Sequence, residues 1–154
     1  MSYPTIQQIA QFILSKAPMS NFKLNQLCYY ADSWNFVVNG KHFAKSDFQA
    51  WINGAFDPKI QEQYTDYLKY QYNDKEEQFL IPQKIKNIPK LNLSSIQICN
   101  QVYIDYGHYT DMELESLIHQ SDPWKNARKG LKPLDRCDKN FNDQDLLDWF
   151  IIEE

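Results

Sequence analysis

Glycine is rare in this sequence, with only four among 154 residues. Phosphate-binding loops and dinucleotide-binding turns need several closely spaced glycines, because their backbones must approach the phosphates of the ligand. The sequence therefore excludes nucleotide sites of these two kinds.

Cysteine and histidine are also scarce, with three of each. Cys28, Cys99 and Cys137 lie far apart, and the sequence has no Cys-x-x-Cys pair and no closely spaced histidine pair. A structural zinc site needs such ligands at short spacings, so we expect no metal and no cofactor. Cys28 lies between Leu27 and Tyr29 in an apolar helical pattern, which predicts core packing rather than a reactive thiol.

Long apolar runs and clustered positive charge are missing as well. The longest apolar stretches are about four residues, as at 149–152, whereas a membrane-spanning helix needs about 20. The N-terminus lacks the basic and apolar stretches of a signal peptide, so we expect a cytoplasmic protein. The net charge is −4 and only two arginines occur, which disfavours nucleic acid as a partner.

Apolar residues make up 43% of the sequence and aromatic residues 15%, enough for the core of a single domain over residues 1–154. Apolar positions recur at helical spacing in several segments, bounded by helix-start and helix-stop signals. They predict six or seven helices, over residues 5–17, 20–39, 57–71, 94–107, 110–118, 122–130 and 142–151.

The second predicted helix is apolar around much of its circumference, so we expect it to be central and packed on several sides. Two short strands are expected between Lys41 and Gly54, with Gly54 in a turn where a side chain would obstruct. Residues 71–92 have poor periodicity and predict an irregular excursion. The fold class is therefore mainly α (α+β), with one small β-hairpin. The apolar positions of the second helix are Phe22, Leu24, Leu27, Cys28, Tyr30, Ala31, Trp34, Val37 and Val38.

Three stretches are unusual: KLNQLCYYA at 23–31, FQAWING at 48–54 followed by Pro58, and LIHQSDPW at 117–124 followed by Arg128. In this order and spacing they resemble the Panacea antitoxin domain, also described as the SocA-like or GepA-like family, over nearly the whole chain. The sequence departs from the family pattern at Cys28, where leucine is usual, and at Gln49, where glutamate is usual. Residues 54–56 read Gly-Ala-Phe in place of the common Gly-Pro-Val.

The resemblance implies a mainly helical fold and the neutralisation of a toxin by direct protein–protein binding. It allows two alternatives: a proteolytic adaptor that delivers its toxin to a cellular protease, and a phage-related regulatory protein. We thus expect an antitoxin of a toxin–antitoxin system rather than an enzyme, with its cognate toxin as partner. The candidate toxin-contact or motif residues are Lys23, Gln26, Tyr29, Tyr30, Trp34, Trp51, Gly54, His119, Asp122, Trp124 and Arg128.

The charged and histidine side chains among these candidates leave alternatives open. Lys23 and Arg128 either pair internally or reach a partner. A hydrolase would use His119 as a base beside Asp122. The structural interpretation is that His119 bonds to backbone at a helix junction while Asp122 caps the next helix. The tryptophans Trp34, Trp51 and Trp124 are expected to pack mainly in the core.

Overall fold

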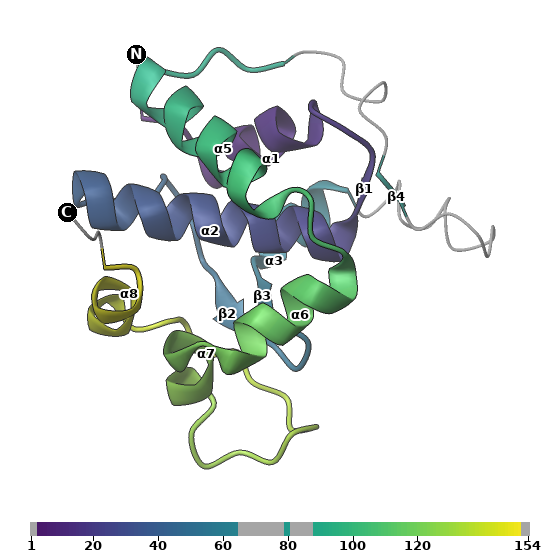
Figure 1. Ribbon diagram of the computed structural model, residues 1–154, viewed down its shortest axis with the longest axis vertical. Coiled ribbons are helices and arrows are strands. Elements are labelled where there is room, and N and C mark those ends of the chain that lie inside the picture. Colours follow the sequence, from purple (N-terminus) through teal and green to yellow (C-terminus); the bar gives the residue numbers. More distant parts are fainter. Residues whose placement is uncertain (1–2, 65–78, 81–87, 152–154) are drawn as a thin grey trace.

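The computed structural model describes residues 3–64, 79–80 and 88–151 (Figure 1). In these residues the chain is mainly α-helical with a small β part, which confirms the predicted fold class. The helices are α1 (Ile6–Leu14), α2 (Asn21–Asn39), α3 (Pro58–Gln63), α5 (Leu93–Tyr106), α6 (Asp111–Gln120), α7 (Asp122–Ala127) and α8 (Asp143–Trp149). The strands are β1 (Met19–Ser20), β2 (Gln49–Ala50), β3 (Ala55–Phe56) and β4 (Phe79–Leu80).

Capping boxes form at the starts of α1 and α6. At α1 the Thr5 hydroxyl accepts from the Gln8 amide at 3.2 Å, and the Gln8 side chain accepts from the Thr5 amide at 3.0 Å. At α6 Thr110 and Glu113 make the same pair of bonds, at 3.2 and 2.9 Å. Each box satisfies two backbone donors that a helix start otherwise leaves unpaired, which is why these starts could be predicted from local sequence.

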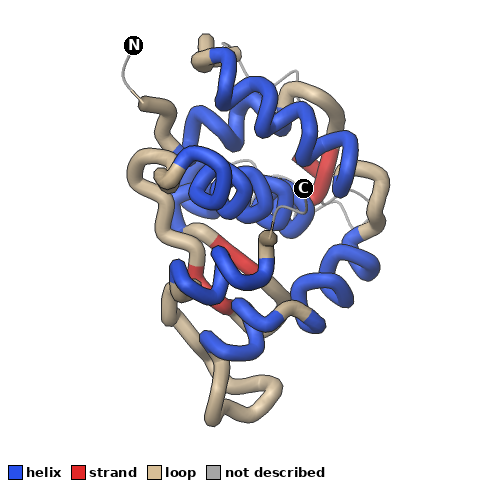
Figure 2. The backbone as a smooth tube through the Cα atoms, turned by 60° about the vertical axis from the view of Figure 1, so that its left-hand side comes forward, coloured by secondary structure: helices blue, strands red, loops and turns tan. Residues whose placement is uncertain are grey.

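Helix α2 is the central element, as its apolar circumference predicted. The Ser20 side chain caps its start, and Gly40 ends it in the left-handed conformation with φ of 74°. Helices α1 and α5 lie on one side of α2, while the β2–β3 hairpin and helices α6 to α8 lie on the other (Figures 1 and 2). Side chains on several faces of α2 are therefore buried, among them Leu24, Leu27 and Cys28.

The β part consists of two short antiparallel pairs in the residues that the structure covers. In the hairpin, Gln49 is opposite Phe56 and Ala50 is opposite Ala55. The hairpin was predicted within 41–54, but its second strand begins after Gly54, because Gly54 closes the turn. The second pair joins β1 to β4, so Phe79 and Leu80 dock on the body, whereas the rest of the predicted excursion at 71–87 lies outside the described residues.

Three details depart from the simple sequence pattern. Helix α5, expected from residue 94, begins at Leu93, because the Asn92 side chain caps it by accepting from the Ser95 amide. Val38 is 52% exposed, since exposure rises through the last turn of α2. The last helix buries Leu146 and Phe150 but leaves Leu147 and Ile151 exposed, because one narrow face of the short α8 meets the core.

Candidate functional site

The second and third sequence motifs meet in the structure. The Nε2 of His119, at the end of α6, donates to the Ile52 carbonyl at 3.1 Å. The Nε1 of Trp124, in α7, donates to the Trp51 carbonyl at 2.9 Å. The rings of His119 and Trp124 stack with centroids 4.2 Å apart. These two side chains therefore hold adjacent carbonyls of the hairpin turn.

Arg128 extends this row to a third consecutive carbonyl. Its Nη1 donates to the Ala50 carbonyl at 2.9 Å, and its Nη2 donates to the Asp135 carbonyl at 2.7 Å. The guanidinium lies 5.2 Å from the Trp124 ring, and the residue is only 6% exposed. Arg128 thus joins the hairpin to the loop after α7. Of the two roles considered for its charge, the structure shows internal pairing.

The first motif holds the other side of the same hairpin. The buried Gln26 amide donates from Nε2 to the Ala55 carbonyl at 2.8 Å, and its Oε1 accepts from the Ala55 amide at 3.0 Å. A Cβ on Gly54 would lie 2.7 Å from the same Oε1, so the turn requires glycine for space, as expected. Lys23 also pairs internally, since its Nζ donates to the Tyr109 carbonyl at 2.9 Å.

The aromatic candidates differ in their surroundings. Tyr29 and Tyr30 are both buried, and Tyr30 stacks on Tyr106 with centroids 4.0 Å apart. Trp34 and Trp124 are half-buried and pack against the core. Trp51 instead stacks on Phe56 at the edge of the hairpin, with centroids 4.8 Å apart.

Trp51 also lines a groove of about 670 Å³, which we call the Trp51 groove. The lining residues come from the hairpin, from α3 and from the loop at 136–138. Its lining residues are Gln49, Trp51, Ile52, Asn53, Phe56, Gln61, Arg136, Cys137 and Asp138.

The His119–Asp122 pair that a hydrolase would use is not formed. The Nε2 of His119 is occupied by the Ile52 carbonyl, so His119 bonds to backbone of the hairpin rather than of its own helix junction. Asp122 is exposed and is the first residue of α7. It does not cap that helix: Ser121 occupies the N-cap position and turns its hydroxyl back to the Ile118 carbonyl at 2.6 Å.

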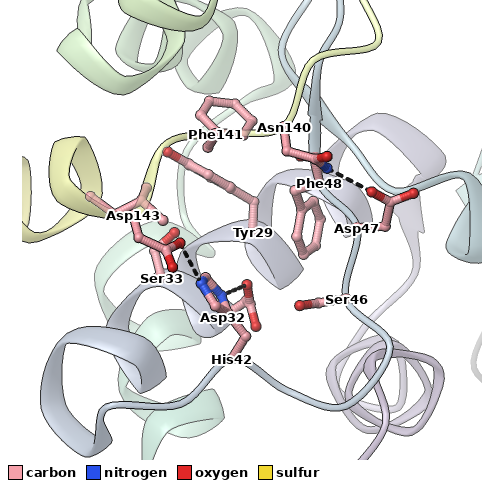
Figure 3. Close-up of a pocket in the computed structure, with 11 residues that line it drawn as sticks. Tyr29, Asp32, Ser33, His42, Ser46, Asp47, Phe48, Asn140, Phe141 and Asp143 are labelled. Carbon is pink, nitrogen blue, oxygen red and sulfur yellow. Dashed lines mark hydrogen bonds and ion pairs between the residues drawn. The ribbon is translucent and has the colours of Figure 1, made fainter.

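A second cavity, missed by the sequence analysis, lies where α2, the loop at 42–48 and the start of α8 meet (Figure 3). We call it the His42 pocket, and its volume is about 140 Å³. His42 joins two carboxylates there: its Nδ1 is 2.7 Å from Asp32 Oδ2 and its Nε2 is 2.8 Å from Asp143 Oδ1. Asp32 also accepts from the Phe43 amide at 2.7 Å.

The two carboxylates hold His42 as an imidazolium. The hydrogen bond to Asp32 contributes most to raising the pKa of His42 to about 9, and Asp143 adds to it against the opposing effect of burial. The ring also stacks on Phe36, with centroids 4.4 Å apart. His42 therefore ties α8 to α2 as a cation at neutral pH.

The wall of the His42 pocket contains two buried hydroxyls. Tyr29 and Ser33 are each 1% exposed, and neither hydroxyl oxygen has a partner in good hydrogen-bond geometry among the described residues. Burial raises the pKa of Tyr29 well above its usual value, and a weak hydrogen bond with the Ser33 hydroxyl opposes this rise. The two hydroxyls thus interact with each other outside ideal hydrogen-bond geometry. Buried hydroxyls with unused hydrogen-bonding capacity are costly in a protein interior, so these two atoms mark a place that a polar group can fill.

The remaining observations concern the Cys28 thiol, metal ligands and membrane-spanning helices. Cys28 is fully buried, and burial raises the pKa of its thiol well above the usual value, which agrees with core packing. Within the ranges described, no group of three or more histidine, cysteine, aspartate or glutamate side chains is arranged to hold a metal ion. In the same ranges, no helix has the length and apolar character needed to span a membrane.

The sequence matches the model of one protein family, described as antitoxin SocA-like, Panacea domain, over residues 24–125. The match covers about two thirds of the chain. It contains Gln26, the hairpin, His119 and Trp124, whereas Lys23 and Arg128 lie outside it. No curated protein and no solved structure matches the chain significantly. The chain belongs to the SocA-like Panacea domain family of antitoxin-like proteins.

Proposed function

We propose that this protein is the antitoxin of a toxin–antitoxin pair, and that it neutralises its cognate toxin in the cytoplasm by direct protein–protein binding. The family match over residues 24–125 carries this proposal. The family is antitoxin-like, and binding is the simplest way for a folded domain of this size to block another protein.

The contacts of the motif side chains support a binding scaffold. Gln26, His119, Trp124 and Arg128 all bond to the backbone of the hairpin or its turn. Each of these bonds fixes the position of the hairpin or its turn. Their role in neutralisation is therefore to hold a surface in shape.

Trp51 is the motif residue best placed to contact the toxin. The row of bonds to carbonyls 50–52 fixes the backbone on which it stands, and it lines the Trp51 groove beside Phe56. Tryptophan is enriched among the residues that dominate binding energy at interfaces. A stable interface buries about 1,200–2,000 Å² in total, so the toxin would also cover surface around the groove.

Co-expression tests this function. The chain is expressed with the small protein encoded by the adjacent gene, and growth rescue and co-elution in size-exclusion chromatography are measured together. We expect rescue and a shared peak. Two separate peaks with full rescue would contradict direct binding, and a toxin level that falls only when a cellular protease is present would favour the adaptor alternative.

A pair of tryptophan variants tests the placement of the contact surface. Trp51→Ala should weaken co-elution, while Trp149→Ala should not, because Trp149 is 44% exposed on α8 and does not line the groove. Both comparisons are normalised to folded protein by circular dichroism. Equal retention of the toxin by the two variants would remove Trp51 from the interface while leaving the antitoxin function itself intact.

A further inference from the structure

The His42 pocket has the composition of a binding site rather than of a packing defect. Its mouth carries charged side chains: His42 is 31%, Asp47 38% and Asp143 59% exposed in their side chains. Its floor is aromatic and buried, formed by Tyr29, Phe48 and Phe141 together with other apolar side chains. A charged rim over an apolar floor is the usual character of small-molecule sites.

The charges of the pocket favour a cation. Three carboxylates, Asp32, Asp47 and Asp143, face a single imidazolium, and no lysine or arginine lines the pocket in the part of the chain that the structure describes. Lys59 approaches Asp47 at 4.0 Å and offsets part of its charge. The pocket keeps a net negative charge, and Asp143 is the carboxylate most open to a guest at its mouth.

The two buried hydroxyls are independent of this charge and point to the same kind of guest. The oxygens of Tyr29 and Ser33 interact only weakly, with each other, and neither has a partner in good hydrogen-bond geometry among the described residues. Both side chains belong to the pocket wall in Figure 3. Each oxygen can accept a hydrogen bond from an N–H group. The faces of the aromatic floor also attract cations.

The volume of the pocket and the arrangement of its side chains narrow the class of ligand that fits. A cavity of roughly 150 Å³ holds a molecule the size of benzene, and the His42 pocket is about 140 Å³. The described side chains offer no set of three metal ligands, so a bare metal ion fits poorly. A small organic cation with several N–H donors fits the volume, the charge and the hydroxyls together.

We propose that the His42 pocket binds a small organic cation of the guanidinium or alkylammonium class. The cation lies over the aromatic floor, donates to the Ser33 and Tyr29 oxygens and faces the Asp143 carboxylate. The site is completed by residues 140–146, beyond the region that matches the family model. The proposal does not depend on the antitoxin function, because it rests on the pocket alone.

The test is a titration of the purified full chain followed by ¹H–¹⁵N NMR. Methylguanidinium is the probe, and N-methylurea is the control because it has a similar shape and no charge. We expect saturable shifts of the Ser33, Phe48 and Asn140 amides with methylguanidinium, and at least about tenfold weaker binding of N-methylurea. Equal binding of the two probes, shifts that do not saturate, or the same response to Mg²⁺ would overturn the proposal.

Three variants keep this test specific. Ser33→Ala removes one hydroxyl that has no partner in good geometry, so the free protein should remain folded, but methylguanidinium should bind about tenfold more weakly. Asp143→Asn should weaken binding to a similar extent. Asp145→Asn is the matched control, since Asp145 lies in the same first turn of α8 without lining the pocket. If Ser33→Ala and Asp143→Asn bound the probe as the parent does, the cation site would be refuted. Buried water would then be the partner of the two hydroxyls.

A last titration distinguishes a free guanidinium cation from the arginine side chain of a bound protein. N-acetyl-arginine N-methylamide presents the guanidinium on a peptide unit, as an arginine of a bound protein would. Binding equal to that of methylguanidinium identifies a site open to a protein side chain. Binding of methylguanidinium alone identifies a site for a free cation. Both results support the proposed cation chemistry.

Discussion

Gly54→Ala is the change whose effect the structure defines most closely. Gly54 does not have a positive φ, so a side chain there causes no backbone strain. The obstacle is Gln26: a Cβ at position 54 would lie 2.7 Å from its Oε1, 3.1 Å from its Cδ and 3.2 Å from its Nε2. Gln26 is 0% exposed, so its amide has little room to move aside.

The magnitude follows from the two bonds that this amide makes. Displacing it breaks the bonds of 2.8 and 3.0 Å to the Ala55 carbonyl and amide. Each buried group left unpaired costs about 1–3 kcal/mol. Replacing glycine by alanine also restricts the unfolded chain, which returns about 0.4–1 kcal/mol. We expect Gly54→Ala to lower the free energy of unfolding by about 2–4 kcal/mol.

A double-mutant cycle measured by urea denaturation isolates this cause. Gln26→Ala removes the obstructing amide and is itself destabilising. In that background Gly54→Ala should cost close to nothing, so that the two changes are strongly non-additive. Equal costs of Gly54→Ala with and without Gln26 would refute the steric argument and the role assigned to the Gln26 amide.

Three more predictions concern stability. Because the pKa of His42 is raised from 6.5 to about 9, its contribution is complete below pH 6.5 and is lost as the pH rises through 9. Denaturant unfolding should show a loss of roughly 1–2 kcal/mol over this window, reduced by the partial exposure of the ring. His42→Gln should flatten the profile, and an equal slope in the variant would assign the dependence to other groups. Trp124→Ala should destabilise the fold by about 3 kcal/mol, because it loses its bond to the Trp51 carbonyl and its stacking on His119; an unchanged melting temperature would contradict this. Asp122→Ala should cost only about 0.3–1 kcal/mol, the worth of an acid in the first turn of a helix, and a larger loss in thermal unfolding would mean that Asp122 has a partner in solution.

The elements that could be predicted are those fixed by local chemistry. The boxes at Thr5 and Thr110 join residues three positions apart, and Gly40 ends α2 through its own backbone conformation. The resemblance to an antitoxin family could be found because its three motifs are short runs of sequence. Each of these signals lies within a few residues, so no tertiary contact had to be known.

The use of the motif side chains could not be predicted, because their partners are distant in sequence. His119, Trp124 and Arg128 bond to backbone carbonyls 67, 73 and 78 positions away. A backbone carbonyl has no signature in the sequence, so nothing identified these targets. The mistaken cap at Asp122 has a similar origin, since Ser121 and Asp122 are both good capping residues and the tertiary position of α7 decides between them.

The His42 pocket was missed although one signal was available. Asp32 lies in a helix predicted to be packed on several sides, and a buried carboxylate needs a partner. His42 is 10 positions away from Asp32, which suffices to suggest a pair, but Asp143 is 101 positions from His42. The second carboxylate, and with it the cavity, depends on how α8 docks.

The most direct test of the antitoxin function is a calorimetric titration of the purified chain into the purified product of the adjacent gene. Purified components contain no protease, so this measurement separates binding from delivery to degradation. The account predicts saturable binding with Kd of roughly micromolar or tighter. Absence of binding, for a chain that still rescues growth and is folded by circular dichroism, would contradict it.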